Sequence, residues 1–229
     1  MSNKNFNKNF GFSKFSQNNF YNNVNKELIN SLDIRSNQKI VDLGCGSGGI
    51  TNLILEKLFT SKSNNFSIIA VDHSETTLKE AKNNLKTISE SILSFVQSRY
   101  EEFSSKLKEK VDLVVLGNAI HYLDDKELVI KDVMKILKPN GKFAFNSSFF
   151  DGAHPEDTLG FYRKWMFKAI KILAKDYKLR PVKSEKIESR VQLNPVQYKN
   201  VLENCGMKIV STKIRTVQVP IEGWLDISS

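Results

Sequence analysis

Two acids and a run of glycines between them are the residues most clearly suited to chemistry. Asp42 stands near the end of a short apolar run, which is followed by Gly44-Cys45-Gly46-Ser47-Gly48-Gly49. Glycines let a backbone turn tightly and approach a ligand closely, and the amides that open the next helix would face that ligand. A second acid, Asp72, closes the next apolar run. This arrangement predicts a binding loop at the carboxyl ends of parallel strands.

The glycines fit two cofactor motifs. Gly44, Gly46 and Gly49 satisfy the dinucleotide pattern G-x-G-x-x-G, in which the loop faces a pyrophosphate. Read with Asp42 and Gly48, the same stretch forms the pattern D-x-G-x-G-x-G. A carboxylate two residues before the glycines would repel a pyrophosphate but tolerate a cationic ligand. Asp42 therefore favours a cationic cofactor over a dinucleotide.

Four motifs in order carry a resemblance to a known family. They read VDLGCGSGG from residue 41, IIAVDHS from 68, VDLVVLGNAIHYL from 111 and LKPNGKFAF from 137. The chain resembles the class I S-adenosylmethionine-dependent methyltransferases, in particular the group that acts on small molecules. The resemblance covers about residues 37 to 147, with weaker similarity to 224. It implies S-adenosylmethionine as cofactor and a doubly wound, Rossmann-like, mostly parallel α/β sheet with helices on both faces.

The same resemblance implies roles for the matching positions. Gly44 and Gly46 would lie against the methionine part of the cofactor, with Cys45 between them. Asp42 would lie near the amino group of that part. Asp72 would accept hydrogen bonds from the ribose hydroxyls.

The adenine end of the expected site departs from the family pattern. His73 would flank the adenine, and the loop after the third strand would contribute Arg99 and Tyr100. Relatives often place an acid in this loop, where it accepts a hydrogen bond from the adenine amino group. Arg99 occupies that position, and a guanidinium has no acceptor. Glu101, Gln97 or a backbone carbonyl would substitute.

Methyl transfer from a sulfonium is an in-line displacement, so alignment of nucleophile, methyl carbon and sulfur supplies much of the acceleration. By the resemblance, Asn118 would line the site next to the methionyl part, and His121 follows three residues later. A base is required only where the acceptor must lose a proton, and an imidazole titrates near neutral pH. His121 is the candidate for that base; the alternative is that it only holds the site together.

Aromatic residues gather after the fifth expected strand. An insertion at this point would sit over the carboxyl ends of the strands and act as a lid. Its composition favours an apolar or partly apolar acceptor, although most of its side chains can equally pack a helix against the core. The residues concerned are Phe149, Phe150, His154, Tyr162 and Trp165.

Strands and helices in alternation must position these residues. Continuous apolar strands separated by amphipathic helices imply a parallel sheet covered on both faces. Ser74 is placed to cap one helix, and Asp124 with Glu127 has the spacing of a capping box. Asn194-Pro195 starts the last helix, which Gly206 stops. We expect strands at 39–43, 67–71, 92–96, 111–116 and 141–146, and helices at 13–33, 50–59 and 158–177.

The expected organisation has four parts. These are a tail and cap helix at 1–36, the cofactor-binding core at 37–147, a helical lid at 148–194, and a helix and strand at 195–229. Residues 1–11 are expected to be a disordered tail.

The C-terminal part is expected to supply a sixth strand. Met207–Val219 reads as one extended segment without a turn signal for a hairpin. Because the family's sheet usually has seven strands, the chain is expected to be a fragment. Its fifth strand would then have an unpaired edge, and residues 222–229 would pack loosely at the surface.

Composition bounds the class of protein. The chain has 229 residues, 40% apolar and 26% charged, which suits one globular domain with an insertion. Its net charge of +9 makes a nucleic-acid partner conceivable, but no run of five like charges occurs. Two cysteines, without a Cys/His spacing that suits a metal, predict no metal site and a cytoplasmic location. No apolar stretch is long enough to span a membrane.

Three functions compete on these observations: a methyltransferase for a small metabolite, a nucleic-acid methyltransferase, and a non-catalytic cofactor-binding subunit. An amino methylase of adenine or cytosine would carry Asp/Asn-Pro-Pro-Tyr/Phe after the fourth strand, whereas this chain reads Asn-Ala-Ile-His at 118–121. Neither Cys45 nor Cys205 is placed as a nucleophile for a cytosine enzyme. The intact loop with both acids argues against the non-catalytic subunit. The sequence therefore favours the hypothesis of a small-molecule methyltransferase.

Overall fold

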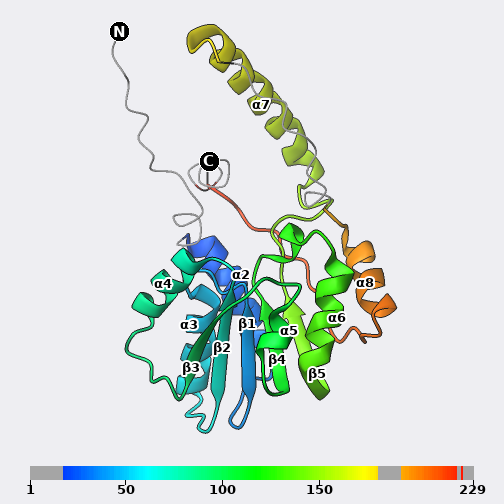
Figure 1. The fold of residues 1–229 in the computed structure, drawn as a ribbon. Coiled ribbons are helices and arrows are strands. Elements are labelled where there is room, and N and C mark those ends of the chain that lie inside the picture. Colours follow the sequence, from blue (N-terminus) through cyan, green and yellow to red (C-terminus); the bar gives the residue numbers. More distant parts are fainter. Residues whose placement is uncertain (1–17, 180–191, 221–222, 224–229) are drawn as a thin grey trace.

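A five-stranded parallel sheet, ordered β3-β2-β1-β4-β5, forms the centre of the protein in the computed structural model. The structure describes residues 18–179, 192–220 and 223. Helices cover both faces of the sheet (Figure 1). The strands are β1 (Lys39–Leu43), β2 (Ser67–Asp72), β3 (Leu93–Gln97), β4 (Val111–Leu116) and β5 (Leu137–Phe145).

The helices follow the expected alternation, and their caps show why they begin where they do. The Ser74 side chain accepts from the backbone amide of Thr77, as expected. Asn194 and Gln197 form a full capping box around Pro195. The helices are α2 (Asn19–Ser31), α3 (Gly49–Thr60), α4 (Glu75–Asn84), α5 (Phe103–Lys106), α6 (Lys126–Ile136), α7 (Glu156–Asp176) and α8 (Pro195–Asn204), with a short 3-10 turn, η1 (Ile120–Tyr122).

Helix α6 is capped one residue later than the sequence pattern predicts. Asp125, and not Asp124, accepts the hydrogen bond from the amide of Leu128 and starts α6. The cap residue must have extended backbone angles while its side chain reaches the third helical amide, and Asp125 meets both conditions.

Two apolar cores fill the spaces between the sheet and its helices. On one face, Ile54 and Leu58 of α3 pack with Ile68 of β2. On the other, Val41 and Leu116 pack with helical side chains that include Val133 of α6. Because side chains alternate along a strand, each inner strand contributes to both cores. This double burial explains the continuous apolar runs in the sequence.

The strand order changes direction between β1 and β4. The chain runs outward from β1 to β3 and then returns to place β4 on the other side of β1. Ligands of doubly wound sheets bind at such a switch point, outside the carboxyl ends of the strands. The glycine-rich loop after β1 lies at this position.

The expected sixth strand is absent from the described residues. Met207–Pro220 has no strand assignment, although Met207 and Ile209 pack against the cluster of Ile130, Leu202 and Cys205, as Phe143 of β5 does. Beyond them the chain is exposed, with Val210 at 85%. Strand formation requires a hydrogen-bonded neighbour, and β-propensity without one does not produce a strand. β5 is also longer than expected, because Leu137 pairs with Val111 across a register shift.

Some expectations fall on residues that are not described. The tail at 1–11 lies outside the described residues, as does 222–229 apart from Gly223, which is buried. The first helix was expected from residue 13 and is seen from Asn19. None of the described helices has the length and apolar content of a segment that crosses a membrane.

Candidate functional site

The glycine-rich loop is fastened to the end of β2. Gly44, Gly46 and Gly48 have positive φ angles of 72°, 52° and 96°, which favour glycine. The amides of Gly44 and Cys45 both donate to the carbonyl oxygen of Val71, at 2.7 and 2.9 Å. These amides are therefore occupied within the protein, and the loop is held in place by its own strand neighbour.

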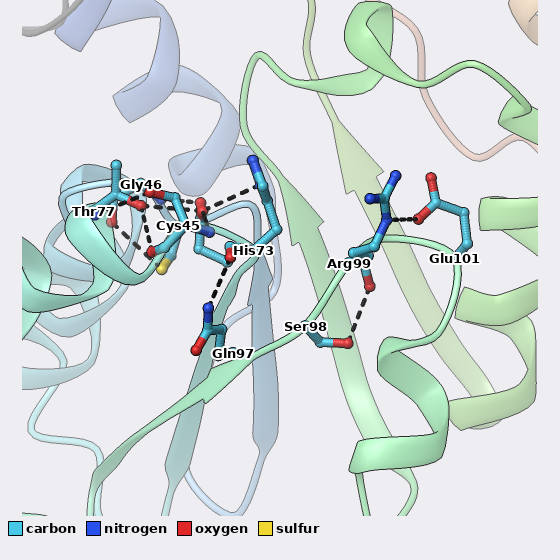
Figure 2. A network of polar contacts seen from close by, with 10 residues as sticks. Cys45, Gly46, His73, Thr77, Gln97, Ser98, Arg99 and Glu101 are labelled. Carbon is cyan, nitrogen blue, oxygen red and sulfur yellow. Dashed lines mark hydrogen bonds and ion pairs between the residues drawn. The ribbon is translucent and has the colours of Figure 1, made fainter.

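Asp72 joins this loop to the start of α4. Its Oδ2 accepts from the Gly46 amide at 2.9 Å, and its Oδ1 accepts from the Ser74 amide and the Thr77 hydroxyl at 2.9 and 3.1 Å. A carboxylate offers about four acceptor directions, so roughly one remains for an outside hydroxyl. Figure 2 shows Gly46 and Thr77 converging on the same point beside Cys45. The carboxylate holds the loop before any ligand arrives.

Asp42 is fully buried with one oxygen unpaired. Its Oδ2 accepts from the Thr51 hydroxyl at 2.6 Å, whereas Oδ1 has no hydrogen-bond partner among the described residues. Burial raises the pKa of Asp42 to about 7, although the hydrogen bonds from Thr51 act in the opposite direction. The nearby Asp72 contributes to this increase. A cation beside Oδ1 would reverse this effect by stabilising the carboxylate.

Asn118 connects the loops after β4 and β5. Its amide donates to Asn146 Oδ1 and its Oδ1 accepts from the Ser148 amide, both at 2.7 Å. The second contact fixes the orientation of the side-chain amide, so the buried Nδ2 is a donor. It lies near the Tyr21 hydroxyl but makes no well-formed hydrogen bond with any described residue. Asn146 in turn donates to Asn25 of α2 at 2.8 Å. The first described helix is thus tied to the carboxyl edge of the sheet.

His121 is held by Ser147. Its Nδ1 lies 3.0 Å from Ser147 Oγ, which also donates to the Phe149 carbonyl at 2.8 Å and accepts from the Phe149 amide at 3.1 Å. Ser147 has one proton, and all three contacts are satisfied only if it goes to the carbonyl and His121 Nδ1 carries its own. The buried Nε2, which has no partner, is then the basic nitrogen.

The surroundings of His121 keep it neutral. Burial, and to a lesser extent the nearby Lys126, lower the pKa of His121 from 6.5 to about 4. The rings of Tyr122 and Phe149 lie 4.1 and 4.8 Å from the imidazole, centroid to centroid. At neutral pH, Nε2 is therefore an uncharged hydrogen-bond acceptor in apolar surroundings.

The structure does not bring Arg99 to the glycine loop. Its side chain is 74% exposed and pairs with Glu101 at 3.4 Å. Figure 2 shows this pair apart from the cluster around Cys45 and Gly46. His73 contacts Asp72 at 3.5 Å, and its carbonyl accepts from Gln97 at 3.1 Å. Gln97 and Glu101 were the side chains expected to replace the missing acid at the adenine. Of these two, Gln97 is hydrogen-bonded to His73 and Glu101 pairs with Arg99.

Tyr100 lies directly over the glycine loop. Tyr100 is partly buried, and the pKa of its hydroxyl is raised, mainly by this burial and then by the negative charge of Asp72. A Cβ added at Gly44 would lie 2.7 Å from that hydroxyl and 3.1 Å from the ring carbon Cε1. The thiol of Cys45 is buried too, and its raised pKa keeps it protonated and unreactive.

Gly44→Ala is therefore expected to destabilise the protein more than Gly46→Ala. Both positions have positive φ, which costs a side chain about 1–2 kcal/mol. Only Gly44 adds a clash, worth about another 1–3 kcal/mol, because no atom lies within 4 Å of a Cβ at Gly46. Urea unfolding of both variants measures the difference, and Tyr100→Phe should recover part of the loss at Gly44. Equal losses at the two positions would contradict the close contact.

Several residues that shape this site were missed by sequence reasoning. Thr51 and Asn25 are polar residues buried on the inner faces of α3 and α2, and a polar residue on an apolar helix face was the available signal. Burial raises the pKa of Tyr21, whereas contacts from the side-chain amides of Asn25 and Asn118 lower it. Ser147 had no sequence signal, since its partner is 26 residues away.

The unpaired atoms allow a test of which group fits. Asp42 Oδ1 accepts, Asn118 Nδ2 donates, and both lie at the carboxyl edge of adjacent strands. An acceptor and a donor together suit an amino-acid moiety with its ammonium and carboxylate, as the methionine part of S-adenosylmethionine provides. Among the described residues, no group of three or more His, Cys, Asp or Glu could hold a metal ion.

A doubly wound sheet with a glycine-rich turn at its switch point and acids on two adjacent strands defines a nucleotide-cofactor-binding α/β protein. Residues 34–202 match the family described as "Methyltransferase domain". The chain belongs to this family, whose methyl donor is S-adenosylmethionine.

Curated relatives are similar over about half of the chain. A malonyl-[acyl-carrier protein] O-methyltransferase of Brevibacillus brevis is 32% identical over 123 residues, which is 53% of this chain and 41% of that protein. A demethylmenaquinone methyltransferase of Lactococcus lactis is 29% identical over 125 residues, 55% and 45% of the two chains. A trans-aconitate 2-methyltransferase of Variovorax paradoxus is 26% identical over 123 residues, 52% and 42%. The chain spans less than half the length of these relatives.

Solved structures share the fold. A chain of the complex between the Trm112 methyltransferase activator of Haloferax volcanii and a methyltransferase matches with a TM-score of 0.60 and 16% identity, over 87% of this chain and 73% of that one. An S-adenosylmethionine-dependent methyltransferase of Aquifex aeolicus matches with a TM-score of 0.55 and 10% identity, over 82% and 81%. At these identities the similarity concerns the fold alone.

Proposed function

We propose that the protein transfers a methyl group from S-adenosylmethionine to a small, partly apolar acceptor by in-line displacement. The observation that carries this proposal is the set of buried atoms on Asp42, Asn118 and His121 that have no partner among the described residues and lie at or just beyond the carboxyl ends of β1 and β4. An unpaired buried polar atom is costly, so three of them at one edge of the sheet favour a polar ligand there.

In this proposal the chain's own residues align the reactants. The cofactor supplies a methyl group made electrophilic by the sulfonium. Asp42 holds the amino group through Oδ1, and Asn118 donates to the same amino-acid part through Nδ2. Asp72 takes a ribose hydroxyl with its remaining acceptor direction while it continues to hold Gly46. Because these residues are fixed by contacts within the protein, little ordering remains to be done when the reactants bind.

His121 would act on the acceptor. Its Nε2 accepts a hydrogen bond from the nucleophilic O–H or N–H and takes that proton where the acceptor must lose one. Ser147 holds the ring in the tautomer that leaves Nε2 free. An acceptor that ionises by itself needs only the positioning contact.

The class of acceptor is inferred from the surroundings of His121 and from the relatives. Phe149 and Tyr122 flank the imidazole and favour an acceptor with an apolar part. The relatives are named for malonyl-[acyl-carrier protein], demethylmenaquinone and trans-aconitate, which combine apolar or unsaturated carbon with a carboxyl or hydroxyl group. We propose an acceptor of this kind for this chain.

The test is transfer of a radiolabelled methyl group. The chain is incubated with labelled S-adenosylmethionine and, in separate arms, a metabolite extract, a panel of unsaturated carboxylic acids and quinols, and total RNA. Label is expected in a small molecule in the first two arms and is expected to be lost in Asp72→Ala. Label in RNA alone would support the nucleic-acid alternative. Absence of cofactor binding in a titration would contradict both.

The raised pKa of Asp42 predicts a pH dependence of cofactor binding. Below about pH 7 the carboxyl carries a proton that an incoming ammonium must displace. Affinity should therefore rise about 5- to 10-fold between pH 6 and 7.5. Without cofactor, the free energy of unfolding changes with pH in the opposite direction. The folded protein holds the Asp42 proton more tightly than the unfolded chain does, so its stability falls as pH rises from about 4 to about 7. Calorimetry at several pH values measures the first effect and urea unfolding the second.

The charged and polar groups around Asp42 require a control. Asp72, Cys45, Tyr100 and Tyr21 all interact with Asp42 electrostatically, and the His73 imidazole faces Asp72. Asp42→Asn should remove the pH dependence between 6 and 7.5, whereas His73→Gln should retain it. If His73→Gln removes it instead, Asp42 is not the source of the pH dependence.

A further inference from the structure

Helix α7 stands away from the rest of the protein. Figure 1 shows it projecting from the sheet and its covering helices. No residue of α7 whose burial is described is buried, and the exposed fractions of Phe161 and Phe167 are 70% and 62%. Exposed large apolar residues over a whole helix are unusual in a soluble domain and mark a surface for interaction.

The two kinds of side chain on α7 are segregated. Lys164, Lys168, Lys171 and Lys175 are spaced by four, three and four residues, so they form one stripe along the helix. We call this the lysine stripe. The rest of the circumference is mainly apolar. Its exposed large members are Phe161, Met166, Phe167, Ile170, Ile172 and Leu173, and we call them the apolar face.

The lysine stripe is not neutralised by the part of the protein that the structure describes. No acidic residue occurs between 158 and 175. Among the described residues, none of the four lysines forms an ion pair, and Lys171 lies over the ring of Phe167 at 4.5 Å. The helix therefore presents positive charge and apolar surface together to its surroundings.

We infer that α7 lies on the surface of a lipid bilayer that contains anionic lipid. A nucleic acid would be matched by the lysine stripe but would leave the aliphatic residues of the apolar face exposed. An apolar protein groove would match that face but offer nothing to the stripe. A bilayer interface matches both, since acyl chains take the apolar face and headgroup phosphates take the lysines. The helix is not long and apolar enough to cross the bilayer, so it lies along the surface.

Co-sedimentation of the full chain with vesicles tests this inference. One vesicle is phosphatidylcholine alone, and in the other about a third of the lipid is phosphatidylglycerol. The protein is expected to sediment with the anionic vesicles near 0.1 M salt and to be partly released near 0.5 M salt. It is not expected to bind the neutral vesicles. Tryptophan emission should shift to the blue on binding, because Trp165 lies on the same helix.

Two α7 variants separate the contributions. The triple variant Lys164→Glu, Lys168→Glu, Lys175→Glu reverses the lysine stripe. The triple variant Phe161→Gln, Ile172→Gln, Leu173→Gln makes the apolar face polar while retaining helix propensity. Each is expected to lower the vesicle partition coefficient about tenfold or more.

Matched controls carry the same substitutions elsewhere on the surface. The charge control makes the same change at three exposed positions outside α7, as Lys62→Glu, Lys86→Glu and Lys108→Glu. The apolar control is Phe59→Gln, Leu128→Gln and Val196→Gln, at 48%, 44% and 66% exposure. Both controls should bind vesicles like the parent chain, and circular dichroism must show that every variant is folded.

Three results would overturn the inference. They are failure of the parent chain to bind anionic vesicles, retention of binding in either α7 variant, and equal losses in the controls. Binding of RNA that is lost with the lysine stripe but kept in the apolar-face variant would assign the helix to nucleic acid instead.

Discussion

Asp72→Ala is expected to weaken S-adenosylmethionine binding by about 1–3 kcal/mol, which corresponds to a 5- to 150-fold higher Kd. Two effects contribute. The substitution removes a charged acceptor for the ribose, and it releases Gly46, Ser74 and Thr77 from the carboxylate that holds them. Isothermal titration calorimetry on the folded variant measures the change.

Thr77→Val separates those two effects. It removes one internal donor to Asp72 and leaves the carboxylate in place. If Asp72 acts mainly on the ribose, Thr77→Val should retain affinity within about threefold. If Thr77→Val loses as much affinity as Asp72→Ala, the main role of Asp72 is to hold the start of α4 in place. Unchanged affinity in a folded Asp72→Ala variant would reject the ribose assignment.

His121→Ala is expected to lower kcat about 100-fold or more with little change in cofactor affinity. The loss should shrink at high pH, where the acceptor loses its proton without help. Because the pKa of His121 is held near 4, the parent activity should stay flat from about pH 5 upward as far as this residue is concerned. Steady-state kinetics across pH, with the acceptor found by methyl transfer, measures both effects. A loss below tenfold at every pH would leave His121 as a positioning residue.

Ser147→Ala tests the hydrogen bond that orients the imidazole. The variant keeps Nε2 but frees the ring and its tautomer, so kcat should fall by a smaller factor, about tenfold. The double variant should be no slower than His121→Ala alone, because Ser147 is proposed to act only through the histidine. Losses that multiply in the double variant would contradict that link.

Local features of the fold could be predicted because their causes are local. A strand buried on both faces needs a continuous apolar run, and β1, β2 and β4 show such runs within a residue or two of the expected bounds. Ser74 and Asn194 cap their helices through bonds to residues three positions away. Between Asp124 and Asp125 the pattern failed, because backbone angles decide which of two adjacent aspartates becomes the cap.

Pairing across the sheet could not be predicted in the same way. The segment from Met207 has the alternation of a strand, but a strand exists only if another presents its free edge in register. Arg99 stands where the family pattern places an acid, yet its side chain pairs with Glu101 and stays exposed. The position of Arg99 in the chain suggested a place in the site, whereas the direction of its side chain depends on contacts that the sequence does not show.

The sequence by itself determined the order of strands and helices, the glycine loop and its two acids, since each depends on residues close together in the chain. Only the tertiary structure decided that Asp42 keeps one unpaired oxygen, that Ser147 orients His121, and that α7 leaves the core. These features depend on contacts between segments far apart in the chain. Burial and hydrogen bonding at such contacts are set by the packing of the whole domain, and no local pattern of residues encodes them.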